Sequence, residues 1–381
     1  MAYFDNAATT FPKPEKVYSF INEYYRVNGA SAGRGRYESA MSASRLFDDT
    51  RSRIQDLLYC PAKQVVFTPT ATIALNIIIQ GLINKDIKNV YITPFEHNAI
   101  TRTLHHFETH NRIRIHQLKV NRELRYDFDA IKRQFEQHKP DLLIMSHASN
   151  VCGLIAPIEE LSIIAKEYGA IVVVDMAQTA GLVPCNIGLE TIDFAVFAGH
   201  KTLYGPTGIS GFVMKPDIDL EPILFGGTGF DSANQDMPLS LPERFEMGTM
   251  NSLGIAGLNA SLQWIKEIGI DTIRKTEEKN RQKLLDIFSL FDFIKPVGNI
   301  LGNDYVGVVS VLVEGISSDS CGSIFDQLGI SVRSGLQCAP LAHRFLGTFP
   351  SGTVRFSVSY FTSEKDFQEL EKALAYIEDN L

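Results

Sequence analysis

The strongest candidates for catalytic residues are a carboxylate and an amine, each of which follows an apolar run. Asp175 comes directly after the run IVVV, where an unpaired carboxylate is costly to bury. A protonated pyridine nitrogen would satisfy it, and the ring would then draw electrons from a bound substrate. Lys201 lies in the glycine-containing segment FAGHKTLYGPTG, where a desolvated amine could form a Schiff base. A helix N-cap at Asp175 and a solvated surface lysine at Lys201 are the alternatives.

Further polar residues follow other apolar runs of the same region. Thr70, Ala71 and Thr72 precede a helical run, so their amides and hydroxyls could hold a phosphate at the positive helix end. Capping of the helix by threonine explains this pattern equally well. Three more side chains could contact an aromatic ring or its hydroxyl, or could be purely structural: His97, Asn150 and Gln178.

Two residues of the C-terminal third could handle a substrate. Arg355, in GTVRFS, has a planar fork that matches a carboxylate, although a salt bridge would explain it equally. Cys338 lies in the loop-like segment SVRSGLQCAPLAH, in which Arg333 and His343 are expected to favour the thiolate. The five cysteines are widely scattered, which predicts free thiols and no metal site.

Apolar runs alternate with amphipathic ones between about residues 60 and 215, which predicts an α/β fold with a mostly parallel sheet and helices on both faces. The expected strands are 64–68, 89–93, 141–146, 170–175, 193–198 and 208–214. The expected crossover helices include 71–83, 127–137 and 157–168. Because ligands bind beyond the carboxyl ends of such strands, the polar residues that follow them are expected to converge on one site.

The chain is expected to form two domains. Residues 16–254 would form a large cofactor-binding domain, and residues 1–15 with 255–381 a smaller α+β domain that contains a long polar helix at 272–288. The Gly/Asp/Ser-rich stretch 226–238 is the most loop-like segment and could be mobile.

Composition narrows the function to small-molecule chemistry. The net charge is −8 without a long basic run, which argues against a nucleic-acid partner or an anionic membrane surface. The apolar stretches fall short of the roughly 20 residues that span a bilayer, and the start MAYFDNAATT does not read as a signal peptide. A cytoplasmic protein is expected.

The order of the motifs resembles the class V aminotransferase family, in its cysteine desulfurase and selenocysteine lyase branch. The resemblance runs from YFDNAATT to VRSGLQCAP and GTVRFS, and its most specific pieces are VDMAQTAG (174–181) and GHKTLYGPTGISG (199–211). The cysteine loop is short, as in the group II members. The resemblance implies a fold type I enzyme that uses pyridoxal 5'-phosphate and works as a homodimer with shared active sites.

The reaction that the resemblance implies is removal of sulfur from L-cysteine, which gives alanine and a persulfide on Cys338 for a protein or small-thiol acceptor. The alternatives are a selenocysteine lyase, another C–S lyase without an obligatory persulfide, a transaminase, and a noncatalytic protein that binds the same cofactor.

Each candidate residue takes a role from the resemblance. Lys201 would hold the cofactor covalently, Asp175 would pair with its ring nitrogen, and His97 would stack on the ring. The other implied contacts are Asn150 and Gln178 with the ring oxygen, Ala71, Thr72 and His200 with the phosphate, Thr249 with the phosphate in the neighbouring subunit, and Arg355, Arg333 and Asn150 with the substrate.

Several positions depart from the family pattern. Thr70 and Ile73 stand where the family usually has Gly and Glu, and Ala198 replaces a phosphate-contacting serine. Each lost neutral hydrogen bond would cost about 0.5–1.5 kcal/mol of cofactor affinity. Tyr37 and Thr362 replace a histidine and an asparagine, which bears on substrate detail.

Overall fold

A seven-stranded sheet forms the centre of the larger part of the molecule. The computed structural model describes residues 1–32, 35, 37–230 and 233–380. The strands pair in the order β2-β8-β7-β6-β5-β3-β4, with bounds β2 Gln64–Thr68, β3 Asn89–Ile92, β4 Arg114–Gln117, β5 Leu142–Ser146, β6 Ile171–Asp175, β7 Phe194–Ala198 and β8 Ser210–Met214. β8 pairs antiparallel with β2 and β7, and the other four pairs are parallel, so the predicted mostly parallel sheet is confirmed.

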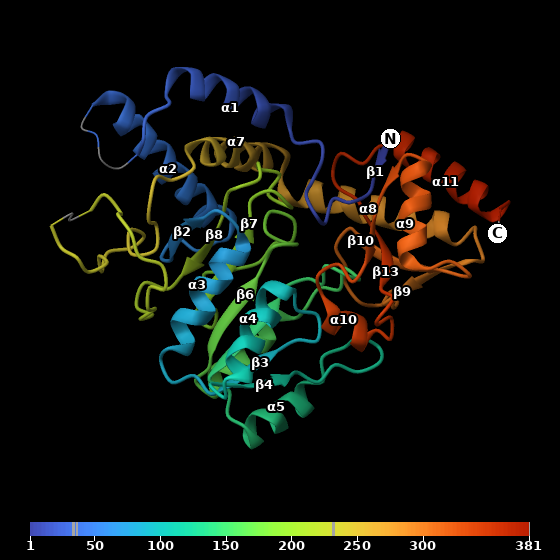
Figure 1. Cartoon of the computed structure of the whole chain (residues 1–381), viewed down its shortest axis with the longest axis horizontal. Helices are drawn as coiled ribbons and strands as arrows, with labels where there is room; N and C mark the ends of the chain where they lie inside the picture. Colours follow the sequence, from blue (N-terminus) through green and yellow to red (C-terminus); the bar gives the residue numbers. More distant parts are fainter. Residues whose placement is uncertain (33–34, 36, 231–232, 381) are drawn as a thin grey trace.

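Helices surround this sheet (Figure 1). Alternate residues of its central strands pack against different helical layers. In β5, Leu142 and Ile144 face the core shared with α3 (Ala71–Ile83) and α4 (Asn98–Thr109). Leu143 and Met145 face the opposite core. That core is built with α2 Glu38–Leu57, α5 Phe128–Gln137, α6 Ile158–Glu167 and α7 Ser252–Ile268. Because both faces are covered, the strands read as continuous apolar runs.

A four-stranded antiparallel sheet forms the smaller part of the molecule. Its order is β12-β13-β10-β9, with bounds β9 Ile294–Val297, β10 Val308–Val313, β12 Arg333–Gly335 and β13 Thr353–Ser357. Its core is shared with α8 Ile270–Phe288, α9 Ser318–Gln327 and α11 Glu364–Glu378. The start of the chain joins this part, since β1 (Ala2–Tyr3) pairs in parallel with β11 (Ile330–Ser331).

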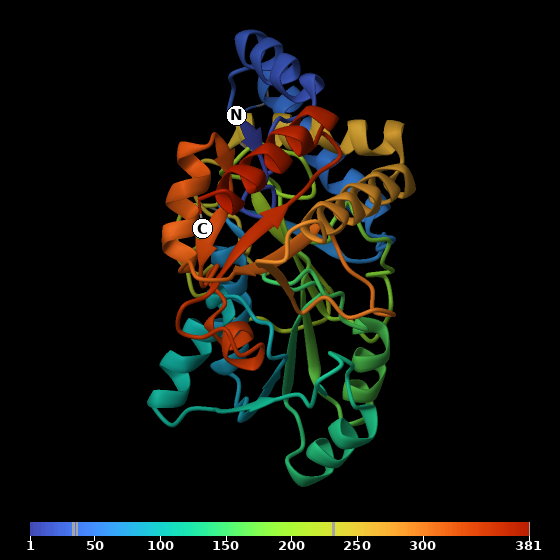
Figure 2. The same cartoon turned by 90° about the vertical axis from the view of Figure 1, so that its right-hand side faces the viewer.

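The two parts meet along segments that are far apart in sequence. The short helix α10 (Pro340–Phe345) lies near α4 in both views (Figures 1 and 2). Within the larger part, helix α7 packs against α2 and against α1 (Glu15–Val27). The division into residues 16–254 and residues 1–15 with 255–381 stays a prediction. In the part of the chain that the structure describes, no helix is long and apolar enough to cross a membrane.

Candidate functional site

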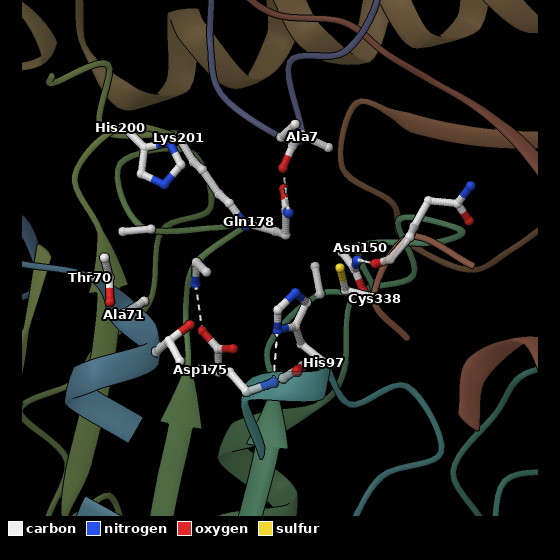
Figure 3. Close-up of a pocket in the computed structure, with 18 of the residues that line it drawn as sticks. Ala7, Thr70, Ala71, His97, Asn150, Asp175, Gln178, His200, Lys201 and Cys338 are labelled. Carbon is white, nitrogen blue, oxygen red and sulfur yellow. Dashed lines mark hydrogen bonds between the residues drawn. The ribbon is translucent and has the colours of Figure 1, made fainter. Parts of the chain in front are cut away.

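A cavity of about 300 Å³ opens at the carboxyl ends of β5, β6 and β7 (Figure 3). Every site residue predicted from the sequence lines it, except Thr249: Ala71, Thr72, His97, Asn150, Asp175, Gln178, His200, Lys201, Arg333, Cys338 and Arg355. Thr249 lines a separate cavity of about 350 Å³ beside α2. Of the departing positions, Thr70 and Ala198 also line the first cavity, whereas Tyr37 lies outside its lining and is exposed.

Asp175 ends β6 at the base of the cavity and is buried. Its Oδ1 accepts a hydrogen bond of 2.9 Å from the amide of Ala177. Burial raises the pKa of this carboxyl, while that hydrogen bond and the nearby charge of Lys201 oppose the shift. A cationic ring nitrogen in the cavity would therefore stabilise the ionised form of this buried carboxyl.

Lys201 lies in the turn that joins β7 to β8, the one direct connection between antiparallel neighbours in the large sheet. The amide of Gly199 donates to the carbonyl of Ile209 at 3.1 Å, and a Cβ at Gly199 would lie only 2.5 Å from that carbonyl oxygen. Glycine is thus required to close the turn. Desolvation lowers the pKa of Lys201 to about 8, with Asp175 acting in the opposite direction.

His97 caps the N-terminus of α4 and presents its ring to the cavity (Figure 3). Its Nδ1 accepts a hydrogen bond of 3.0 Å from the amide of Ala99. Burial lowers the pKa of the ring to about 4, so the imidazole is neutral and its proton lies on Nε2. A neutral ring of this kind is suited to stacking on a flat ligand.

The residues expected at a phosphate lie at the N-terminus of α3 and in the Lys201 turn. Thr70 caps α3, since its Oγ1 accepts a hydrogen bond of 3.2 Å from the amide of Ile73. Ala71 and Thr72, in the first turn, line the cavity. The Nδ1 of His200 is buried without a partner among the described residues, and burial lowers the pKa of its ring to about 4. A phosphate would accept hydrogen bonds from the free backbone amides at the N-terminus of α3.

Arg355 on β13 is buried at 2% exposure and forms the salt bridge that was one of its two interpretations, while its binding of a substrate carboxylate stays a prediction. Its Nη2 donates to Oδ1 of Asp5 at 2.8 Å, and its Nη1 donates to the carbonyl of Asn150 at 2.9 Å. Its Nε has no partner in the described part of the chain. The arginine therefore forms a salt bridge and also lines the cavity as a cation.

Cys338 is the exposed member of the five cysteines, whereas the other four are buried. The loop backbone is left-handed at Gln337 (φ 39°) and at Cys338 (φ 58°). Buried Gln337 anchors the loop, because its Nε2 donates to the carbonyl of Thr353 at 2.9 Å and its own carbonyl accepts from Nδ2 of Asn150 at 2.6 Å. The backbone is thus fixed while the thiol stays accessible.

One expectation about the cysteine loop is wrong. His343 was expected to supply positive charge near Cys338, but it is fully buried and its Nε2 lies 2.8 Å from Oε1 of Gln337. Burial lowers the pKa of His343 to about 4, so its ring is neutral and supports Gln337. Arg333 is the neighbouring cation that remains.

Residues of the N-terminal segment 5–13 complete the cavity, and this part of the site was not predicted. The carbonyl of Ala7 accepts from Nε2 of Gln178 at 3.0 Å, and Ala7 lines the cavity (Figure 3). The carbonyl of His200 accepts from the amide of Thr10 at 3.2 Å and from Nζ of Lys13 at 2.6 Å. The motif YFDNAATT was the available signal, but its partners lie far away in sequence.

Glu96 is a second residue that sequence reasoning missed. It is fully buried and accepts hydrogen bonds from Oγ1 of Thr93 at 2.6 Å and from Oγ of Ser146 at 2.7 Å. It therefore ties the turn that carries His97 to the end of β5. Burial raises the pKa of Glu96 to about 7.

The site places a lysine, an aspartate and an arginine together at the carboxyl end of a sheet that is covered by helices on both faces. This chain belongs to the aminotransferase class-V family, whose model matches residues 2–370. It is 31% identical to a probable cysteine desulfurase of Pyrococcus abyssi, over 99% of this chain and 93% of that one. It is 30% identical to a probable cysteine desulfurase of Methanothermobacter thermautotrophicus, over 98% of this chain and 94% of that one.

The structure is similar to the apo structure of a cysteine desulfurase from Thermococcus onnurineus NA1. The TM-score is 0.92 at 29% identity, and the match covers 100% of this chain and 95% of that chain. The fold is that of fold type I pyridoxal phosphate enzymes, and the family resemblance seen in the sequence is confirmed.

Proposed function

We propose that this chain is a pyridoxal phosphate-dependent cysteine desulfurase, which removes sulfur from L-cysteine to give alanine and a persulfide on Cys338. The observation that carries the proposal is the cavity itself, which brings an accessible cysteine together with Lys201, Asp175 and Arg355. A transaminase would need Lys201, Asp175 and Arg355 but has no use for the thiol. The relatives named as cysteine desulfurases support the same reaction.

The residues present fit the cofactor. Asp175 is a buried carboxyl that could pair with the ring nitrogen, His97 is a neutral ring for stacking, and Gln178 is a donor beside Lys201. The start of α3 and His200 would hold the phosphate. When bound, pyridoxal phosphate supplies an electron sink for charge released at the substrate α-carbon.

The side chains of the chain itself would perform three tasks. Arg355, held in place by Asp5, would bind the substrate carboxylate, with Arg333 and Asn150 beside it. The Nζ of Lys201 would move the α-proton, since a pKa of about 8 leaves much of the amine neutral near that pH. The thiolate of Cys338 would take the substrate sulfur, so that the C–S bond breaks and an S–S bond forms.

We also propose a homodimer that works in the cytoplasm, with Thr249 completing the phosphate site of the neighbouring subunit. Thr249 lies outside the cavity of its own chain, which leaves it free for that role. Five free cysteines are typical of a reducing compartment. A protein or small thiol would accept the sulfur.

The test is an absorption spectrum of the purified protein with and without L-cysteine, combined with measurement of alanine and sulfide. We expect a visible cofactor band that Lys201→Ala abolishes, and alanine formation that Cys338→Ala abolishes. Retained turnover in Cys338→Ala would instead indicate a lyase without an obligatory persulfide. A visible band without alanine would point to a different amino-acid substrate, and no band would overturn the cofactor assignment.

A further inference from the structure

Cys338 borders two cavities, and only one of them contains Lys201. The second cavity measures about 830 Å³ and lies between α4, β12 and α10. This volume is in the range of sites that bind small molecules, about 300–1,000 Å³. A thiol on the rim of both cavities can receive an atom from one side and pass it to the other.

Three arginines are among the residues that line the second cavity. Arg102 and His105 come from α4, Arg333 from β12 and Arg344 from α10. In the part of the chain that the structure describes, none of the three guanidinium groups forms a salt bridge, although Arg344 stacks at 4.3 Å on the ring of Phe349.

The one carboxylate in the lining, Glu108, is already engaged. Its Oε1 accepts a hydrogen bond of 3.0 Å from the amide of Ile115. The three guanidinium groups outnumber this one carboxylate, so the charge of the lining favours an anionic ligand that binds beside Cys338.

We propose that this second cavity binds a small thiol that carries carboxylates, and that this thiol takes the sulfur from Cys338. The proposal rests on the proposed function, because it requires a persulfide on Cys338. The acceptor thiolate attacks the outer sulfur of the persulfide, a new S–S bond forms, and the bond from Cys338 to that sulfur breaks. Cys338 leaves as a thiolate and the acceptor becomes a persulfide, so no outside oxidant or reductant is needed.

The exchange can be followed in two stages with the cofactor-loaded protein. First, L-cysteine alone is added, and alanine and the gain of one sulfur atom on Cys338 are measured. Second, mercaptosuccinate, which is dianionic, or the uncharged 2-mercaptoethanol is added, and the loss of that sulfur is timed. Each rate is divided by the rate of the same thiol with a small-molecule persulfide.

We expect the protein to favour mercaptosuccinate, and high salt to weaken that preference. Arg102→Gln and Arg344→Gln should each slow the second stage with mercaptosuccinate about 2- to 5-fold and leave the first stage unchanged. Arg102→Lys and Arg344→Lys should retain most of the rate. Arg112→Gln is the matched control, since exposed Arg112 follows α4 but lies outside the lining.

Equal normalised rates for the two thiols, or a preference that survives both Gln substitutions, would overturn the proposal. Discharge that is slower than turnover with every small thiol would overturn it in favour of a protein acceptor. Failure at the first stage, with no alanine or no sulfur on Cys338, would instead count against the proposed function.

Discussion

Burial has a larger effect than neighbouring charges on the protonation state of His97, His200 and Lys201 in the cavity. It lowers the pKa of His97 and His200 to about 4 and that of Lys201 to about 8. The cavity therefore contains two neutral rings and an amine that loses its proton easily, beside the cation of Arg355. The same cavity can therefore contain a base, Lys201, and a cation that binds anions, Arg355.

The amine of Lys201 should react with added pyridoxal phosphate at a rate that rises with pH and levels off above about 8, because only the neutral amine is a nucleophile. Asp175 now raises the pKa of Lys201, so Asp175→Asn should move the midpoint to lower pH. Stopped-flow absorbance of the cofactor-free protein over a pH series measures both midpoints. A native midpoint near the ordinary lysine value would contradict the argument.

Single residues could be predicted where the signal was local. Asp175 and Lys201 follow apolar strands, and Cys338 lies in a Gly- and Pro-containing loop, so each was recognised within about ten residues of sequence. Asp5 and Lys13 could not be, because their partners Arg355 and His200 lie 350 and 187 residues away. His343 is neutral because it is buried, and the sequence around it does not predict that burial.

Among the elements, the segment 5–13 acts as a brace for the turn that carries Lys201. Lys13 donates to the carbonyl of His200 at 2.6 Å and to Oγ1 of Thr10 at 2.7 Å. Thr10 Oγ1 in turn donates to the carbonyl of Lys201 at 3.0 Å. The peptide between His200 and Lys201 is thus held from outside the sheet.

Lys13→Met, which keeps most of the side-chain length but removes its donors, should lower kcat by roughly tenfold with little change in KM, because small misplacements of a reacting group are costly. Lys16→Met is the matched control, since Lys16 pairs on the surface with Glu267. Steady-state kinetics of both variants with L-cysteine test this. Equal kcat values for the two variants would mean that the brace has no role in positioning Lys201.

Most elements of the large sheet were predicted, since their apolar runs are long and bounded by turns. The predicted strands at 64–68 and 170–175 match β2 (64–68) and β6 (171–175) closely. β4 was missed because its sequence RIHQ is not apolar and the strand lies at the sheet edge. The reversed direction of β8 was missed as well, since strand direction follows from pairing partners and not from the apolar pattern.

At the scale of the molecule, a buried carboxyl joins the two parts. Glu277 on α8 accepts a hydrogen bond of 3.0 Å from the hydroxyl of Tyr204, which lies in the Lys201 turn. That hydroxyl also accepts from the amide of Tyr360 at 3.0 Å. Burial raises the pKa of Glu277 to about 8, so the folded protein prefers the protonated acid.

This preference makes the free energy of unfolding depend on pH. The folded pKa is above the unfolded value, so the protonated acid stabilises the fold most at low pH, and stability declines as pH rises towards about 8. Glu277→Gln, which stays neutral, should therefore be more stable than the native protein at pH 8, by a few kcal/mol, and similar to it near pH 5. Urea unfolding at both pH values measures the difference, and a variant that is less stable at both would contradict the assignment.

The large sequence separation between Asp5 and Arg355, which form a salt bridge, also has a consequence for synthesis of the chain. Residues 5–13 leave the ribosome before the rest of the site, and Asp5 pairs with an arginine that is translated 350 residues later. Asp175 and Lys201 are translated well before Cys338 and Arg355. A chain released early would therefore contain the residues proposed for the cofactor without those proposed for the substrate and its sulfur. Only a product that extends past Arg355 could join the two functions.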